Sequence, residues 1–246
     1  MKYLDATIVI PAFNEDLSIQ KTLELLNQVD GVNFEVLVIV DTPHDLTLKA
    51  FEKTLKKPTS SQILIQTYGR GPANAIRFGI DQATSDCVVV MMADGSDDVR
   101  VIPDLVNLVT RGVAVACASR YMSGGQQIGG PRFKKFLSKT AGSLLFFFAG
   151  VGTHDPTNSF KAYSRSFIQD VGIESRSGFE IGIELVAKAR RSRLAIAEIP
   201  TIWLDRTAGE SNFQFRKWIP QYFKWFVHCF GPVKASNQSP KKAEKE

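Results

Sequence analysis

The sequence predicts an α/β protein whose mostly parallel sheet is covered by helices on both faces. Two observations support this fold class. Short runs of apolar, largely β-branched residues recur in the first half of the chain, and most are continuous rather than alternating, as in strands buried on both sides. Helix-like segments separate these runs, so strand and helix alternate as in a doubly wound sheet.

The expected elements of the first half follow one another without long gaps. Asn14, Glu15 and Asp16 are placed to cap the first expected helix, and Pro72 suits the first position of the third. The predicted strands are residues 6–10, 36–40, 63–66, 87–91 and 113–118. The predicted helices are residues 16–28, 46–57, 72–83 and 102–110.

The second half has a different composition. We expect helices at 133–149, 179–190 and 218–230 and one more strand at 195–199, and the first and last of these helices are unusually aromatic. Residues 1–230 are expected to form a single domain. Residues 231–246 are rich in Lys, Ser, Pro and Glu, which predicts a disordered basic tail.

Composition excludes several classes of protein. Of the 246 residues, 44% are hydrophobic and 22% charged, a globular balance that excludes disorder for most of the chain. The net charge of +5 is too small to indicate a nucleic-acid partner. Three widely spaced cysteines argue against a disulfide scaffold or a zinc site and predict a reducing compartment. We expect neither a signal peptide nor a membrane-spanning helix.

Acidic side chains follow three of the expected strands. Glu15 comes after the first strand, Asp41 after the second, and Asp94 after the fourth. Because the carboxyl ends of parallel strands share one edge of a sheet, these carboxylates are expected to lie together. They suit a ribose hydroxyl, a base amine, or a divalent cation on a pyrophosphate. Any one of them alone is better explained as a solvated loop residue or a helix cap.

The order of these turns resembles the family 2 glycosyltransferases of the GT-A fold. The matching segments are Pro-Ala-Phe-Asn-Glu at 11–15, Asp41, and Ala-Asp at 93–94. Segments 119–121, 155–161 and 205–211 are similar to later motifs of the dolichol-phosphate mannose synthase branch. That branch moves a sugar from a nucleotide to a polyprenyl phosphate. The resemblance implies a GT-A-like (Rossmann-like) fold and an inverting glycosyltransferase.

The resemblance also implies a role for each matching residue. The implied nucleotide-binding residues are Pro11, Ala12, Asn14, Glu15, Asp41 and Gly71. The implied catalytic residues are Asp94, Asp155, Arg120 and Arg206. The acceptor phosphate would contact Arg120, Arg132 and Ser211. Arginine suits such contacts because its planar fork binds phosphate oxygens in pairs.

The metal motif departs from the family pattern. The usual motif has two Asp flanking Ala and a Gln two residues later, whereas this chain has Met92 and Ser96 at two of those positions. Methionine is a poor ligand for a hard cation, so the implied Mg²⁺ or Mn²⁺ would depend on Asp94 and Asp97. The turn after Asp41 also lacks the common Asp-Asp-Gly-Ser sequence. GDP-mannose and UDP-glucose therefore both stay open as donors.

The implied acceptor needs no strong base, because a phosphate oxygen is already ionised at neutral pH. A sugar hydroxyl as acceptor would instead require a carboxylate base, with Asp94, Asp97 and Asp155 as candidates. The protein would act mainly by positioning the substrates and stabilising charge on the leaving nucleoside diphosphate.

The aromatic helices predict contact with a membrane surface. In 133–149, apolar residues recur at helical spacing with Lys134, Lys135 and Lys139 among them. Aromatic rings and cations together suit the interface of a bilayer, so we expect a peripheral protein at the cytoplasmic face. Packing into the core is the alternative for both stripes. The second stripe consists of Trp218, Tyr222, Trp225, Phe226 and Cys229.

Other functions remain open on the sequence alone. The same fold can serve a glycosyltransferase with a soluble sugar acceptor, a nucleotidyltransferase, or an inactive scaffold, which Met92 favours. Gly69 and Gly71 open a helix like a dinucleotide-binding turn, but Asn74 stands where the third Gly belongs. An oxidoreductase is therefore disfavoured, and the oligomeric state stays open.

Overall fold

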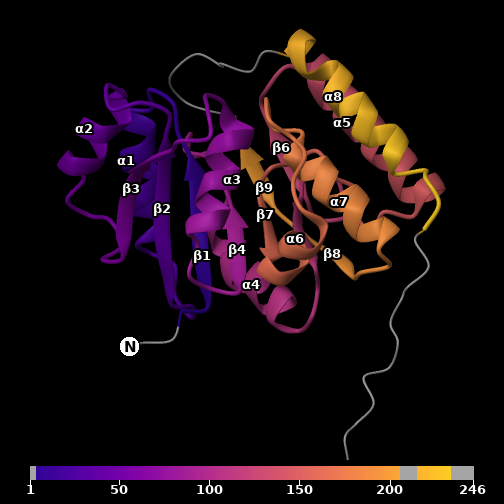
Figure 1. The fold of residues 1–246 in the computed structure, drawn as a ribbon, viewed down its shortest axis with the longest axis horizontal. Helices are drawn as coiled ribbons and strands as arrows, with labels where there is room; N and C mark the ends of the chain where they lie inside the picture. Colours follow the sequence, from indigo (N-terminus) through magenta and orange to yellow (C-terminus); the bar gives the residue numbers. More distant parts are fainter. Residues whose placement is uncertain (1–3, 206–214, 234–246) are drawn as a thin grey trace, which may run out of the picture.

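A seven-stranded sheet forms the centre of the molecule in this computed structural model, which describes residues 4–205 and 215–233, without the side chains of 215–217 (Figure 1). The strand order is β3-β2-β1-β4-β7-β5-β8. Six strands run the same way, and β7 is antiparallel to both neighbours. The strands are β1 (Ala6–Pro11), β2 (Phe34–Val40), β3 (Ser61–Ile65), β4 (Cys87–Val90), β5 (Val115–Ser119), β7 (Lys161–Ser164) and β8 (Ile196–Pro200).

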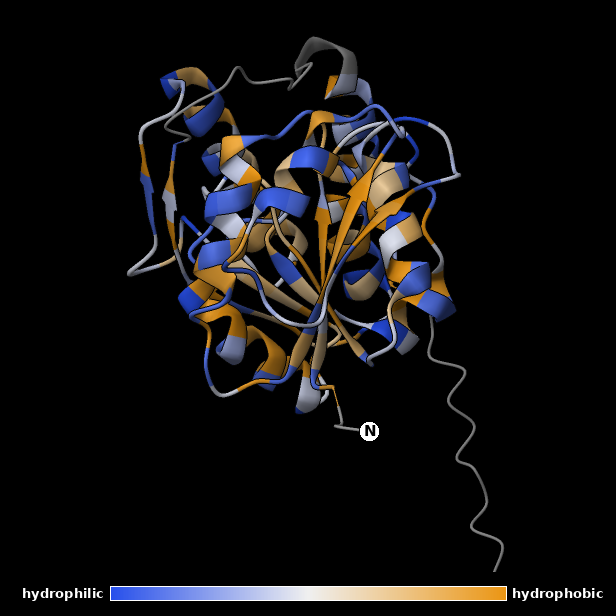
Figure 2. Ribbon diagram, turned by 90° about the vertical axis from the view of Figure 1, so that its left-hand side faces the viewer, coloured by the Kyte–Doolittle hydropathy of each residue, from blue (hydrophilic) through white to orange (hydrophobic). Residues whose placement is uncertain are grey.

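Helices cover both faces of this sheet and divide the core in two. On β1, Ile8 and Ile10 pack against one layer of helices, while Val9 between them packs against the other, because side chains alternate along a strand. Figure 2 shows the strands mostly apolar and the surrounding helices mixed. The first layer is α1 (Leu17–Leu26), α2 (Leu46–Lys53) and α4 (Ile102–Thr110). The second is α3 (Pro72–Gln82), α6 (Arg165–Val171), α7 (Ile181–Arg191) and α8 (Phe215–His228).

The predicted alternation of the first half is confirmed. Asp16 caps α1 by accepting a hydrogen bond from the Leu17 amide, and α3 begins at Pro72. Sequence reasoning missed β7, which is four residues long and begins with the charged Lys161. It also missed α6 and a small parallel pair, β6 (Gln126–Ile128) with β9 (Ile202–Leu204). These strands are too short for an apolar run to mark them.

The structure corrects the interpretation of α8. This helix begins at Phe215, so Pro220 lies inside it rather than in its first turn. The stripe expected to face a membrane instead faces the protein, with Trp225 and Cys229 buried in the core. Among the described side chains of α8, the exposed apolar ones are Ile219, Phe223 and Val227.

The other aromatic helix, α5 (Arg132–Leu144), continues as one π-helical turn, Leu145–Ala149. Its apolar side chains are mostly exposed, although Leu145 is buried in the core. The most exposed of them are Phe133, Phe136, Phe147 and Phe148. In Figure 1, α5 and α8 lie at the end of the molecule opposite α2.

The C-terminal segment is described as far as residue 233. Arg190 and Arg191 of α7 donate hydrogen bonds to the carbonyl oxygens of Gly231 and Pro232. The rest of the predicted tail lies outside the described residues, and the domain division at 230 stays a prediction. Among the helices that the structure describes, none has both the length and the apolarity to cross a membrane.

Candidate functional site

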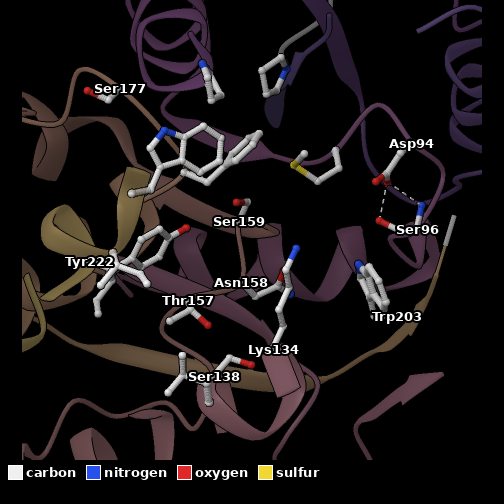
Figure 3. Close-up of a pocket in the computed structure, with 18 of the residues that line it drawn as sticks. Asp94, Ser96, Lys134, Ser138, Thr157, Asn158, Ser159, Ser177, Trp203 and Tyr222 are labelled. Atoms are coloured by element: carbon white, nitrogen blue, oxygen red, sulfur yellow. Dashed lines mark hydrogen bonds between the residues drawn. The ribbon is translucent and has the colours of Figure 1, made fainter. Parts of the chain in front are cut away.

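A cavity of about 1250 Å³ opens at the carboxyl edge of the sheet. Its polar side is formed by the turns after β1, β2, β4 and β5, and its apolar side by α5, α8 and the start of α7. Figure 3 shows Asp94 and Ser96 on one side, Tyr222 on the other, and Lys134 reaching between them. The strand ends contribute Pro11, Ala12, Glu15, Asp41, Met92, Asp94, Ser96 and Arg120. The apolar side contributes Leu137, Ala141, Leu144, Phe179, Trp218, Tyr222, Phe223 and Phe226.

The turn after β4 presents Asp94 to the cavity. The Oδ1 atom of Asp94 accepts hydrogen bonds from the Ser96 amide at 3.1 Å and the Ser96 hydroxyl at 2.5 Å. The carbonyl oxygen of Ala93 accepts a bond from the Thr22 hydroxyl of α1. These bonds hold the turn, so the Asp94 carboxylate is oriented before any ligand arrives.

Asp97 lies beneath this turn and is not part of the cavity lining. It is 5% exposed, and its Oδ2 accepts a hydrogen bond from the Met92 amide at 2.9 Å. Burial raises the pKa of Asp97 to about 7; the nearby Asp94 charge adds to the rise, whereas the Met92 amide and Arg120 oppose it. Asp97 therefore supports the turn and does not join Asp94 at the cavity surface.

Asp41 closes the turn between β3 and α3. Its Oδ1 accepts a hydrogen bond from the Gln66 side chain at 2.8 Å, and its Oδ2 accepts one from the Gly71 amide at 3.0 Å. Gly71 has φ +118°, and a Cβ there would lie 2.9 Å from the Ser177 carbonyl oxygen. Glycine is thus required at this position. Asp41 and Gly71, both predicted to bind the nucleotide, line the cavity.

The turn after β1 divides the remaining predicted nucleotide residues. Pro11, Ala12 and Glu15 line the cavity, but Asn14 does not. Asn14 has φ +52° and points at α2. Its amide donates to Asp45, and its side-chain oxygen accepts from the Leu46 amide. The side chain of Asn14 therefore binds the start of α2, not the helix at 16–28 that it was expected to cap.

Arg120 and Asp155 form a buried ion pair at the floor of the cavity. Arg120 donates to the Asp155 carboxylate through Nε at 2.7 Å, Nη2 at 2.9 Å and its backbone amide at 3.0 Å. Burial opposes ionisation of Asp155, but the Arg120 charge and hydrogen bonds outweigh it and lower the pKa of that carboxyl. Arg120 lines the cavity, whereas Asp155 is fully buried. Asp155 therefore orients Arg120 and is not placed to act as a base.

The predicted residues of the acceptor site are less well defined. Arg132 is the first residue of α5, is exposed, and is not part of the lining. Arg206 and Ser211 lie outside the described residues. Sequence reasoning missed several lining residues because they come from segments distant in the sequence and carry no strand-end signal. They include Trp203, together with Lys134, Tyr222 and Asn158, which the sequence placed on the aromatic helices and in segment 155–161 without a role in the site.

The implied Mg²⁺ or Mn²⁺ can be tested against the residues present. Within the described ranges, no group of three or more His, Cys, Asp or Glu side chains gathers as a metal site. Asp94 nevertheless presents a carboxylate at the sheet edge, where Mg²⁺ is commonly held by one or two carboxylates together with substrate phosphates. The donor set therefore fits a cation that arrives with a diphosphate rather than a preformed protein site.

The fold and the cavity define the class, a GT-A-like α/β protein with its site at the carboxyl edge of a mostly parallel sheet. The family model described as Glycosyl transferase family 2 matches residues 7–172. The chain belongs to that family, as the resemblance implied.

Two curated relatives and two solved structures illustrate the similarity. The dolichol-phosphate mannosyltransferase of Pyrococcus furiosus is 28% identical over 90% of this chain, which spans 64% of that relative's length. The polyprenol monophosphomannose synthase of Mycolicibacterium smegmatis is 28% identical over 83% of this chain and 79% of its own length. Glucosyl-3-phosphoglycerate synthase from Mycobacterium tuberculosis shares the fold in crystals with Mn²⁺, UDP and phosphoglyceric acid. That structure has a TM-score of 0.68 and 16% identity, and the match covers 94% of this chain and 80% of the other. A second crystal structure of the same synthase, with Mg²⁺ and UDP, has a TM-score of 0.64 and 17% identity. That match covers 94% of this chain and 81% of the other.

Proposed function

We propose that this protein transfers a sugar from a nucleotide-sugar donor to a polyprenyl phosphate at the cytoplasmic face of a membrane. The observation that carries the proposal is the continuity of one cavity. Its polar side, with Asp94 and Arg120, suits a diphosphate and a phosphate, and its apolar side between α5 and α8 suits a hydrocarbon chain. The names of the two curated relatives support the same acceptor class.

The polar side would hold the reacting groups. A phosphate oxygen of the acceptor attacks the anomeric carbon of the donor sugar. The bond from that carbon to the nucleoside diphosphate then breaks, which inverts the carbon. A cation held with the diphosphate at Asp94 would neutralise charge on the leaving group. Arg120 is already fixed by Asp155, so its guanidinium can meet a phosphate without reorganising.

The apolar side would hold the isoprenoid chain. Leu137, Ala141 and Leu144 of α5 line the cavity together with Tyr222 and Phe226 of α8. Removing apolar surface from water contributes about 25 cal/mol per Å², so a chain a few isoprene units long would bind without specific polar contacts. This mode of binding tolerates different chain lengths.

The outer surfaces of α5 and α8 would contact the bilayer. Phe147 and Phe148 are 72% and 74% exposed, and Val227 of α8 is 52% exposed. Exposed apolar side chains that gather in a patch mark interaction surfaces. Lys139 on α5 is exposed as well, and such cations are attracted to anionic headgroups. The three cysteines are free and buried, which suits the cytoplasmic side.

Transfer into an organic-extractable product tests the proposal. Purified protein would receive polyprenyl phosphate, Mg²⁺ or Mn²⁺, and labelled GDP-mannose or UDP-glucose in separate reactions. Label in the lipid phase from one donor is the expected result and identifies the sugar. Transfer only to water-soluble acceptors would contradict the lipid acceptor, and no transfer by folded protein would favour an inactive scaffold.

A further inference from the structure

A carboxylate on β8 holds the loop that leads to Asp155. The side chain of Glu198 is 11% exposed. Its Oε2 accepts hydrogen bonds from the Thr153 hydroxyl at 3.1 Å and the His154 amide at 2.7 Å. Its Oε1 lies 2.6 Å from Nδ1 of His154. Both oxygens of one carboxylate therefore bind two successive loop residues, which fixes the loop backbone against the sheet.

The same bonds continue to the cavity. The Thr153 hydroxyl oxygen accepts a hydrogen bond from the Asp155 amide at 3.1 Å. Asp155 in turn holds Arg120 through three hydrogen bonds. Thr153 and Asp155 are fully buried, so these bonds are not exchanged with water. Hydrogen bonds are directional, and they run from Glu198 through Thr153 and Asp155 to Arg120. The orientation of Arg120 thus depends on Glu198.

His154 also joins this loop to α5. Its ring stacks on Phe146 with the centroids 3.7 Å apart. The His154 carbonyl oxygen packs so closely on Gly142 of α5 that no Cβ fits there. The loop is therefore held between a strand of the central sheet and the helix that lines the apolar side of the cavity.

We propose that Glu198 and His154 are positioning residues that aim the Arg120 guanidinium at the acceptor phosphate. Asp155 accepts hydrogen bonds from Nε and Nη2 of Arg120, whereas no described residue accepts one from Nη1. The Nη1 nitrogen can therefore donate to a ligand. The inference rests on the proposed function, because it gives Arg120 an acceptor phosphate to bind. Neither residue touches the cavity, so they act through the loop alone.

Glu35 supplies a matched control. It is 6% exposed, and its Oε1 also accepts three hydrogen bonds, from the Thr7 hydroxyl and from the amide and hydroxyl of Thr84. Glu35 lies near the start of β2, at the edge of the sheet opposite the cavity. The Glu35→Ala variant therefore loses a comparable set of buried hydrogen bonds without touching the loop.

Steady-state kinetics with a short polyprenyl phosphate separate positioning from stability. We expect Glu198→Ala to raise the KM for the acceptor about tenfold, the equivalent of one charge-assisted hydrogen bond, with the KM for the donor unchanged. Glu198→Gln keeps an oxygen for Thr153 and the His154 amide and should restore most of the affinity. Glu35→Ala should lower the melting temperature and leave both KM values unchanged. Equal KM values for acceptor in the two Ala variants would overturn the inference.

Amide hydrogen exchange tests the positioning without any turnover. Exchange at the amides of Arg120 and Asp155 should be faster in Glu198→Ala than in wild type, and unchanged in Glu35→Ala. If wild-type protein transferred no sugar to any polyprenyl phosphate, the proposed function would fail while this measurement still tested the loop. Unchanged exchange in Glu198→Ala would overturn the positioning role whatever the acceptor proves to be.

Discussion

The two sides of the cavity are built in opposite ways. On the polar side, Asp41, Asp94 and Arg120 are each held by at least two hydrogen bonds from their own protein. On the apolar side, side chains such as Leu144 and Phe223 are 40% and 64% exposed and contribute area rather than direction. Sugar transfer on the polar side therefore depends on side chains held in a fixed geometry. Binding of the isoprenoid chain on the apolar side depends on the apolar surface that it removes from water.

The largest expected effect follows from breaking the buried ion pair. Arg120→Ala leaves the Asp155 carboxylate buried without its partner, which should lower the free energy of unfolding by about 3–5 kcal/mol. Urea denaturation at neutral pH measures this loss. Arg100→Ala is the control, because Arg100 pairs with Asp98 at 76% exposure, where solvent screens the pair, and its loss should change the free energy of unfolding far less. Similar losses for both variants would refute the fixed geometry of the polar side.

Removing Asp94 tests the polar side by activity. Asp94 lines the cavity and is half-buried, so Asp94→Ala should reduce kcat about 100-fold or more with little change in melting temperature. Asp104→Ala, on the exposed side of α4, should keep full activity. Full activity in Asp94→Ala would exclude Asp94 from the reacting end of the cavity.

Exposed apolar residues beside the cavity test the proposed membrane contact. We expect Phe147→Ser and Val227→Ser each to weaken binding to anionic vesicles about tenfold, because inserting a Phe or Val side chain contributes about 1.5–3 kcal/mol. Flotation with vesicles measures the bound fraction. Leu55 is 95% exposed and follows α2 at the far end of the molecule, so Leu55→Ser should bind like wild type. Equal weakening in all three variants would remove α5 and α8 as the contact surface.

The pH dependence of stability gives the smallest effect. Burial raises the pKa of Asp97 to about 7, so the folded state holds this proton more tightly than the unfolded chain. The contribution of Asp97 is therefore fully favourable below its unfolded pKa, and it is lost as pH rises toward 7. Asp97→Asn removes this dependence. The stability of the variant relative to wild type should increase between pH 5 and 8 by roughly 1–4 kcal/mol, measured by urea denaturation, and a constant difference would contradict the assigned pKa.

The sequence predicted the regular part of the fold because local patterns determine it. Parallel strands buried on both faces read as continuous apolar runs. Pro72 marked the start of a helix correctly, and of the three residues expected to cap the first helix, Asp16 caps it whereas Asn14 binds α2 instead. Local patterns could not reveal β7, since Lys161 interrupts the apolar run. They also could not tell which side of α8 is buried, because Phe223 and Trp225 both belong to aromatic stripes at helical spacing.

The candidate site was predictable only in part, and for a related reason. Strand ends in a parallel sheet share one edge, which brought Glu15, Asp41 and Asp94 to the cavity as expected. Side-chain direction does not follow from position along the chain. Asn14 turns toward α2, and Asp155 turns inward to Arg120. Both assignments needed tertiary contacts that no sequence pattern carries.

The proposed function places a sugar nucleotide and an apolar phosphate in one cavity. It is tested by measuring kcat/KM for a series of acceptor phosphates of increasing isoprenoid length at fixed donor concentration. We expect kcat/KM to rise with each added unit until the apolar side is filled and then to level off. A kcat/KM independent of chain length, or highest for a water-soluble phosphate, would contradict it.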